Sequence, residues 1–269
     1  STVLFDTPIK DLKRLIDSVS NLQNYVSKNN SIKINIRLII WDNSLKNNFY
    51  QEKIEFDKQN IDISFFSSIK NIGYGLGHNS NLLKIKPNKD IWFVALNPDI
   101  YFEGKSLFGF FNYLFGNDEN LACAAPLIFL ANGNIQYSAK KNPTTLSLLV
   151  GRFSFFRKFP FLERYLYSNQ NRDKNYERDI IKCQNLSGCF LVFPSEIFIK
   201  IRGFSKRYFL HFEDADIVRR AALYGETIHC PFGFANHIRG RGSHKSIIQQ
   251  YHLIISYFVY SKFWGYRFM

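Results

Sequence analysis

Three carboxylates, Glu213, Asp214 and Asp216, stand within four positions of the chain, where a loop is expected to enter a helix. A further carboxylate, Asp99, follows the apolar run from Ile91 to Leu96, which predicts a buried strand. Acidic side chains at the ends of strands and helices pack poorly in a core, but they can hold a divalent cation or accept a proton. Together they indicate an enzyme that acts on a phosphorylated, nucleotide-linked substrate.

Each acidic segment also has a simpler interpretation. The acids at 213–216 could complement the dipole of a helix at its first turn, although this explains one or two acids better than three beside aromatic residues. Asn97-Pro98-Asp99 consists of residue types that favour turns. Its place directly after an apolar strand would nevertheless put oxygen ligands where Mg²⁺ or Mn²⁺ could bridge a diphosphate. The sequence favours a functional role for 213–216 and leaves both readings open for 97–99.

Two segments with glycine and polar residues could bind phosphate. The stretch from Asn71 to Asn79 has three glycines before a predicted helix, and such a backbone can approach an anionic ligand closely. It matches neither the Walker P-loop nor G-x-G-x-x-G, and taken alone it is more simply an ordinary turn. The stretch from His237 to Lys245 includes Arg239 and Arg241, which could clamp phosphates or form a basic surface loop.

The net charge of +13 and a pI near 9.5 predict an anionic partner. A nucleic acid is not expected, because no nucleic-acid-binding motif accompanies the charge. The 28 Phe and 15 Tyr residues, many interleaved with Lys and Arg, favour a membrane surface. An AT-rich coding sequence would raise the same counts, but it does not explain why these residues cluster.

The four cysteines form no C-x-x-C pair and lie in or beside apolar runs, so they are predicted to be reduced thiols and not a disulfide frame or zinc site. We expect neither a signal peptide nor a membrane-spanning helix, since no apolar run approaches about 18 residues. The predicted location is therefore the cytoplasm, peripherally on the inner face of the bacterial cytoplasmic membrane.

The order of apolar segments predicts an α/β fold. Strands that alternate with helices form a largely parallel sheet covered on both faces, and ligands bind outside the carboxyl ends of its strands, where Asp42 and Asp99 lie. A helix is expected over 214–224, with Gly225 as its left-handed C-terminal cap. The predicted strands are 2–5, 34–41, 61–66, 91–96, 121–130 and 188–193.

No repeat or low-complexity linker divides the chain, so we expect one domain over residues 1–246, followed by a C-terminal segment, 247–269. Within the domain, the aromatic and basic stretch 148–180 is predicted to be an irregular insertion on the acceptor side. The C-terminal segment could be an amphipathic helix at a membrane interface or a helix packed on the core.

In their order along the chain, these motifs resemble the inverting family 2 glycosyltransferases of the GT-A fold, in particular the bacterial rhamnosyltransferase-like branch. The resemblance implies a Rossmann-like mixed, mainly parallel sheet flanked by helices, with residues 1–100 as the nucleotide-sugar-binding half and 101–246 as the acceptor and catalytic half. The matching segments are Val3 to Pro8, Trp41 to Ser44, Asn71 to Asn79, Leu96 to Asp99, Ser187 to Phe190, Gly203-Phe204, Phe212 to Asp216 and His237 to Ser243.

The resemblance also implies roles for individual residues. Asp214 of the E-D motif would be the catalytic base, Asp99 would bind the diphosphate through a metal, and His237 would lie near that metal. One departure weakens the expected metal site: Asn97 replaces the first acid of D-x-D, although the branch often carries Asn-Pro-Asp. The nucleotide-sugar-binding residues would be Phe5, Asp6, Asp42, Asn71, Gly73, Tyr74, Asn79, Asn97 and Asp99. Those supporting the acceptor side would be Glu213, Asp216, Arg239 and Arg241.

The implied reaction is inverting transfer of a sugar, with L-rhamnose as the first candidate, from a dTDP- or UDP-linked donor to a hydroxyl of a lipid-linked or growing surface glycan, of the O-antigen, lipopolysaccharide or capsule type. Mg²⁺ or Mn²⁺ would be the cofactor and would meet the charge of the leaving diphosphate. The alternative is a non-enzymatic module that binds anionic lipid or glycan. Acids placed beside an anionic ligand without a cation would repel it, which argues against that alternative.

Overall fold

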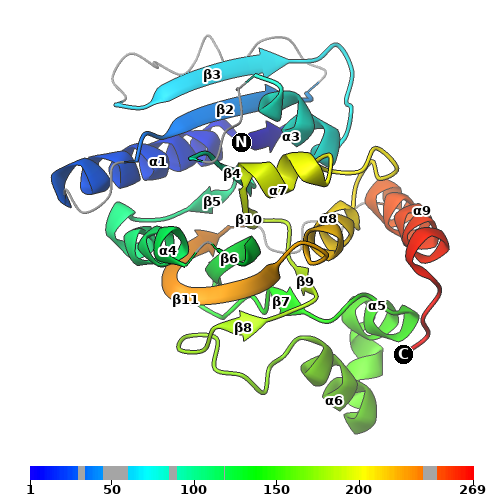
Figure 1. Ribbon diagram of the computed structural model, residues 1–269. Coiled ribbons are helices and arrows are strands. Elements are labelled where there is room, and N and C mark those ends of the chain that lie inside the picture. The colour runs from blue at the N-terminus through cyan, green and yellow to red at the C-terminus, as the bar shows by residue number, and fades with distance from the viewer. Residues whose placement is uncertain (30–33, 45–59, 85–89, 118, 239–246) are drawn as a thin grey trace.

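The computed structural model describes residues 1–29, 34–44, 60–84, 90–117, 119–238 and 247–269. Nine strands form one mixed sheet in the order β3-β2-β1-β4-β10-β6-β11-β5, with β8 paired to β11 (Figure 1). The strands of this sheet are β1 (Thr2–Leu4), β2 (Arg37–Asp42), β3 (Asp62–Ser67), β4 (Trp92–Leu96), β5 (Ile100–Tyr101), β6 (Leu121–Leu130), β8 (Ile181–Lys182), β10 (Phe190–Pro194) and β11 (Glu226–His237). A small second sheet pairs β7 (Ala139–Lys140) with β9 (Asn185–Leu186).

Helices cover both faces of the main sheet, as expected for this fold class. Figure 1 shows α1 and α4 on one side and α3, α7 and α8 on the other. The helices are α1 (Ile9–Asn29), α3 (Tyr74–Leu82), α4 (Gly104–Gly116), α5 (Thr145–Arg152), α6 (Pro160–Asn169), α7 (Ser195–Lys200), α8 (Glu213–Ala221) and α9 (Ile247–Trp264), with a 3₁₀ helix η1 (Ser154–Lys158).

The central strand β4 is apolar throughout because both of its faces are covered. Phe93 and Ala95 point into the core cluster beneath α7 and α8, whereas Leu96 and its neighbour Val94 pack with the cluster under α1 and α4. Successive side chains of a strand face opposite sides of the sheet, so a strand covered on both faces needs apolar residues at every position.

The strand directions bring distant segments together at the carboxyl ends of the parallel strands. β1 runs parallel to β2 and β4, so the carboxyl ends of all three lie on the same side of the sheet. β10 runs antiparallel to β4, with Phe190 opposite Leu96. The segment that leads into β10 therefore meets the segment that leaves β4, and this places Gly188 and Cys189 beside Asn97.

All six predicted strands appear: 121–130 has the predicted ends, and the other five have ends shifted by one to three residues, so that the second begins at Arg37 and not at residue 34. The insertion 148–180 is not irregular, because α5, η1 and α6 occupy most of it. Thr144 and Ser147 form a capping box at the start of α5, and Pro160 takes the first turn of α6. Short helices of this kind carry too few turns for a clear apolar period.

Gly225 is not the left-handed cap that the sequence suggested. Helix α8 ends at Ala221, and the described glycines with positive φ are Gly73, Gly133, Gly203 and Gly265. The reason for a glycine at 225 is space, since a Cβ there would lie 2.6 Å from the carbonyl oxygen of Asn120.

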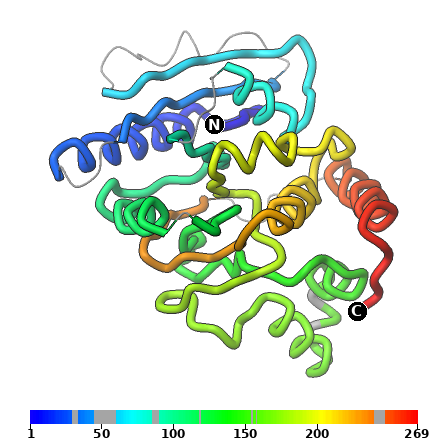
Figure 2. Tube along the Cα trace, in the orientation of Figure 1, coloured from blue at the N-terminus to red at the C-terminus, as the bar shows by residue number. Residues whose placement is uncertain are grey.

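The C-terminal helix α9 packs on the core through one face. Tyr257 and Tyr260 are buried and lie against Tyr208 and Phe212. Figure 2 shows the tail after α9 descending to α5, where the carbonyl of Arg267 accepts a hydrogen bond from the Thr145 backbone N–H at 3.0 Å. Within the described ranges, no helix combines the length and the apolar character needed to cross a bilayer.

We expect the aromatic cluster around Phe198 to carry much of the stability of the face that bears α7. Phe198 is fully buried, and its ring centroid lies 4.1 Å from that of Phe93 and 5.3 Å from that of Phe193. Phe198→Ala should lower the free energy of unfolding by about 3–5 kcal/mol, measured by urea denaturation. Phe161→Ala, at an exposed position, should change it by less than about 0.5 kcal/mol. Equal effects would contradict this account of the core.

Candidate active site

The carboxylate of Asp214 is held by two backbone N–H groups. Oδ2 accepts a hydrogen bond from Gly188 at 2.9 Å, and Oδ1 accepts one from Ala215 at 2.8 Å. A Cβ at position 188 would lie 2.9 Å from the Cβ of Asp214, so only glycine allows this approach. The orientation of the carboxylate is therefore fixed by the backbone.

An unusual turn presents Asp214. His211 and Phe212, both non-glycine residues, have φ of 70° and 65°, in the left-handed region, where such residues cost on the order of 1–3 kcal/mol each. The side chain of Phe212 is buried against Tyr257 and Tyr260 of α9, with ring centroids 5.8 and 5.4 Å away. Burial of this ring offsets the backbone strain and holds the start of α8 in place.

Asn97 and Asp99 lie next to the same backbone segment that holds Asp214. The N–H of Asn97 donates to the carbonyl of Cys189 at 2.9 Å, one residue after Gly188. The structure thus links Asp214 and the Asn97-Pro98-Asp99 turn through two adjacent residues. Segments about 115 residues apart in the chain meet at one edge of the sheet.

His237, at the end of β11, lies beside Asp99. Its Nε2 is 3.3 Å from Oδ1 of Asp99, and its Nδ1 is 2.8 Å from Oε1 of Gln136. Burial is the largest single influence on the pKa of His237 and lowers it, but the hydrogen bonds and negative charges of Asp99 and Cys189 together outweigh burial and raise the pKa to about 10. A protonated His237 forms an ion pair with Asp99, and a neutral one leaves Nε2 able to bind a cation.

The Tyr74 hydroxyl lies beside the backbone segment that holds Asp214. It donates to the carbonyl of Gly188 at 2.8 Å. Burial raises the pKa of Tyr74, and the negative charges of Glu213, Asp214 and Asp99 raise it further. The Gly188 backbone therefore contacts both Tyr74 and Asp214, its carbonyl accepting from the Tyr74 hydroxyl and its N–H donating to the Asp214 carboxylate.

Glu213 is a second acid beside Asp214, and it is almost fully buried. Its Oε2 has no hydrogen-bond partner among the described residues. Burial, and then the charge of Asp214, raise the pKa of Glu213 to about 8. At neutral pH this carboxyl is therefore mostly protonated and adds little negative charge to the site.

A second group of expected residues lies at the ends of β1 and β2. Asp42 is the last residue of β2; it is 2% exposed and accepts a hydrogen bond from the N–H of Ser44 at 2.8 Å. Burial raises its pKa, and the nearby charge of Asp6 adds to this. Asp6 donates its own N–H to Ser44 Oγ at 2.9 Å, and Phe5 is half exposed beside it. The carboxyl ends of β1 and β2 thus carry a buried carboxyl, that of Asp42, and an exposed aromatic ring, that of Phe5.

Asn71 and Gly73 connect this edge to Tyr74. Asn71 Oδ1 accepts from the N–H of Gly73 at 2.9 Å, and Gly73 has φ of 90°. Asn43, to which the sequence assigned no role, donates its side-chain N–H to the Gly73 carbonyl at 3.1 Å and accepts from Ile72 at 3.3 Å. The turn that starts α3 is therefore held by the end of β2.

Two expected residues hold other parts of the chain. Asn79 forms hydrogen bonds with both the N–H and the carbonyl of Phe204, each at 2.8 Å. Asp216 is fully buried, where it accepts from Arg220 at 2.8 Å and from Trp264 Nε1 at 2.9 Å. These contacts give both side chains structural partners. Two further expected residues, Arg239 and Arg241, lie outside the described ranges.

Gln136 contacts two residues of the site, which the sequence did not indicate. Its Oε1 lies 2.8 Å from Nδ1 of His237, and its Nε2 lies 3.4 Å from Cys189 Sγ. Nothing in the local sequence distinguishes it from other residues of a turn after β6. Only the pairing of β6 with β11 brings it to His237.

Asp99 and His237 could supply two ligands to a cation. Over the parts of the chain that the structure describes, no group of three or more His, Cys, Asp and Glu side chains could hold a metal ion. Mg²⁺ sites in nucleotide enzymes commonly use one or two protein ligands and complete their shell with substrate phosphates and water. One carboxylate oxygen and one imidazole nitrogen fit such a shared site.

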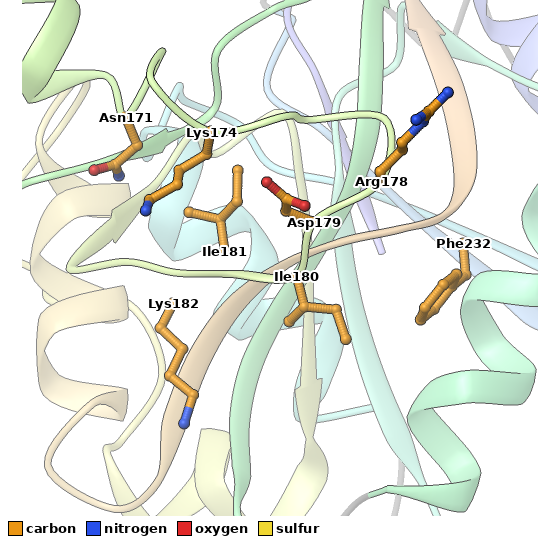
Figure 3. Close-up of a pocket in the computed structure, with 8 residues that line it drawn as sticks. All are labelled: Asn171, Lys174, Arg178, Asp179, Ile180, Ile181, Lys182 and Phe232. Carbon is orange, nitrogen blue, oxygen red and sulfur yellow. The ribbon is translucent and has the colours of Figure 1, made fainter.

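A separate cavity of about 610 Å³ lies away from these residues. Figure 3 shows its lining, which includes Asp179 and the basic side chains Lys174, Arg178 and Lys182. None of the residues expected in the site lines it.

Part of the sequence is similar to known proteins. The sequence is 26% identical to the rhamnosyltransferase WbbL of Escherichia coli over 164 residues, which are 58% of this chain and 57% of that protein. It is also 26% identical to an N-acetylglucosaminyl-diphospho-decaprenol L-rhamnosyltransferase of Mycobacterium tuberculosis, over 58% of this chain and 52% of that protein. The chain thus spans about half the length of the curated relatives it matches. No family model matches the sequence.

Solved structures share the fold at low sequence identity. GalNAc-T7 with UDP, GalNAc and Mn²⁺ aligns with a TM-score of 0.61 and 14% identity, over 88% of this chain and 42% of that chain. The mannosyltransferase PcManGT of Pyrobaculum calidifontis, in complex with GDP-Man and Mn²⁺, aligns with a TM-score of 0.59 and 14% identity, over 97% and 63%. The chain is similar in sequence to rhamnosyltransferases and shares the GT-A fold of these structures. Both expectations are confirmed, and the relatives named here are glycosyltransferases, as expected for this chain.

The buried carboxyl of Glu213 should give this GT-A protein a distinctive pH dependence. Between the unfolded pKa of 4.5 and the folded value of about 8, the folded state binds a proton that the unfolded state has released. The free energy of unfolding should therefore fall as pH rises through this window, by up to about 1.4 kcal/mol per pH unit from this group. Glu213→Gln should remove that contribution. Urea unfolding curves from pH 5 to 8 that run parallel for both proteins would contradict the assignment.

Proposed function

We propose that this chain is an inverting glycosyltransferase that moves a sugar, with L-rhamnose favoured, from a nucleotide-diphosphate donor to a hydroxyl of a lipid-linked or surface glycan. One observation carries the proposal: the Asp214 carboxylate is hydrogen-bonded to Gly188, and the N–H of Asn97 is hydrogen-bonded to the next residue, Cys189. This arrangement supports Asp214 as the proton acceptor and Asp99 as a cation ligand of the same site. The two curated relatives described above are named rhamnosyltransferases, which favours rhamnose as the sugar.

The donor would bind across the ends of β1, β2 and β4. Asp42, Asp6 and Phe5 would hold the nucleoside, with the segment from Asn71 to Tyr74 beneath the sugar. Asp99 and His237 would hold a divalent cation, which would stabilise the charge of the departing diphosphate. Two neighbours of similar fold were crystallised with Mn²⁺ and a nucleotide or nucleotide sugar, which supports a cation here. In this scheme residues 1–100 bind the donor and residues 101–246 carry the acceptor side.

Asp214 would act as the general base. Its two backbone donors orient the carboxylate, so that it can take the proton of an acceptor hydroxyl while that oxygen attacks the anomeric carbon. The displacement is a single step and inverts the configuration. Glu213, mostly protonated at neutral pH, would leave Asp214 as the carboxylate that receives the proton.

The acceptor is proposed to be lipid-linked. One relative's name specifies a diphospho-decaprenol acceptor, and the present chain is strongly basic. Such an acceptor lies in a bilayer, so we place the reaction at the inner face of the cytoplasmic membrane, with this chain attached peripherally.

Replacement of the proposed base gives the most direct test. Asp214→Asn should reduce sugar transfer by about 10²–10⁴-fold, because a positioned general base contributes about that factor. Donor binding, followed as a thermal shift with dTDP-rhamnose, should remain. Asp17→Asn, an exposed acid on α1, is the matched control and should transfer at the normal rate. Near-normal turnover by Asp214→Asn would remove it from the role of base.

The proposed cation site makes a separate prediction about donor binding. Mn²⁺ should increase the thermal shift produced by the donor in the unmodified protein, and Asp99→Ala should lose that increase while keeping its stability without ligand within about 1 kcal/mol. Excess EDTA should abolish transfer. Full transfer in EDTA would show that no cation takes part.

A further inference from the structure

Two helical segments of this protein expose an unusual number of aromatic and aliphatic side chains. Phe155 and Phe161, from η1 and α6, are 59% and 68% exposed. On α9, Ile254 and Phe258 are 57% and 65% exposed, on the side away from Tyr257 and Tyr260. Apolar groups left in water at this density mark an interaction surface.

The two segments are joined through the C-terminal tail. The backbone N–H groups of Thr145 and Leu146 donate to the carbonyls of Arg267 and Phe268, both at 3.0 Å. The Thr145 hydroxyl also bonds to that of Tyr257. Figure 2 shows α5, α6, α9 and the C-terminal tail gathered at one end of the molecule. We call the surface formed by α5, η1, α6, α9 and the tail the aromatic–basic face.

The charges of these segments are predominantly positive. Residues 247–269 contain no Asp or Glu, and the single acid of residues 145–169 is Glu163. The basic residues of the same two segments are Arg152, Arg157, Lys158, Arg164, Lys262 and Arg267. A second copy of this chain would bring like charges together across the contact. An anionic bilayer instead meets the cations with phosphates and the rings with its headgroup boundary.

The same face adjoins the proposed base. The His211 ring, three residues before Asp214, has Asp214, His252 of α9 and Arg152 of α5 as ionisable neighbours. Phe209 stacks on His252 with ring centroids 4.7 Å apart, and its carbonyl lies against Gly73. The loop that presents Asp214 is therefore packed directly on the aromatic–basic face.

We propose that the aromatic–basic face lies on an anionic lipid bilayer and so presents Asp214 to an acceptor anchored in that bilayer. The inference deepens the proposed function and rests on it for the identity of the acceptor. Binding to the bilayer itself requires no turnover and can be measured independently.

The test is flotation of the full chain with vesicles of phosphatidylglycerol or of phosphatidylcholine. The unmodified protein should bind the anionic vesicles at least tenfold more tightly. Lys158→Glu with Lys262→Glu should weaken that binding at least 25-fold, at about fivefold for each lost cation near the surface. Phe161→Ser with Phe258→Ser should weaken it at least tenfold, because both rings leave the headgroup boundary.

Matched controls lie elsewhere on the surface. Ile69→Ser with Leu83→Ser removes two side chains that are 100% and 82% exposed near β3 and α3. Lys10→Glu with Lys13→Glu makes the same change of charge on α1. Both double variants should bind anionic vesicles within about threefold of the unmodified protein.

Three outcomes would overturn the proposal: equal binding to both vesicle types, face variants that bind as well as the controls, or a dimer in light scattering that only the face variants dissociate. Failure of the proposed function looks different. If Asp214→Asn still transferred sugar, vesicle binding by the face would be unaffected. If only the face were wrong, its variants would keep the donor-induced thermal shift and full transfer to a bilayer-embedded acceptor.

Discussion

Two adjacent residues, Gly188 and Cys189, determine the arrangement of the candidate active site. The N–H of one orients the carboxylate of Asp214, and the carbonyl of the other holds the N–H of Asn97. Because these residues enter β10 directly opposite the end of β4, the register of the sheet sets how far apart the two acidic segments lie. Long, flexible side chains have no part in this spacing. The candidate site residues are thereby positioned by the pairing of two central strands, and not by loops alone.

The carboxyl groups of Asp99, Glu213 and Asp214 all act on the Tyr74 hydroxyl, and ionising all three would create charge repulsion within the site. Asp99 is met by His237, whose pKa is raised by that contact, and Glu213 has a raised pKa and keeps its proton. Asp214 is stabilised by two N–H donors. Each acid is thus treated differently by its surroundings, and different environments are what allow neighbouring carboxyls to perform different tasks.

Much of the fold could be predicted, and so could the approach of the Asn97-Pro98-Asp99 turn to the segment that holds Asp214, because apolar strands and the polar residues at their ends leave a clear local pattern. Gln136 and Asn43 could not, since their partners are set by strand pairing between distant segments. The helices within 148–180 were missed because short helices with aromatic residues on several sides lack a period. Gly225 was assigned a left-handed conformation, whereas the carbonyl of Asn120 excludes a side chain there.

Helix α9 connects the chemistry to the surface. Its inner side buries Tyr257 and Tyr260, which support the strained turn at Phe212, and Trp264 bonds to Asp216 of the helix that carries Asp214. Its outer side is also apolar, which is why the helix shows no amphipathic period. A helix that is apolar on both sides needs an apolar neighbour on each. The core supplies one, and the bilayer proposed for the aromatic–basic face would supply the other, so that docking and the position of Asp214 depend on the same helix.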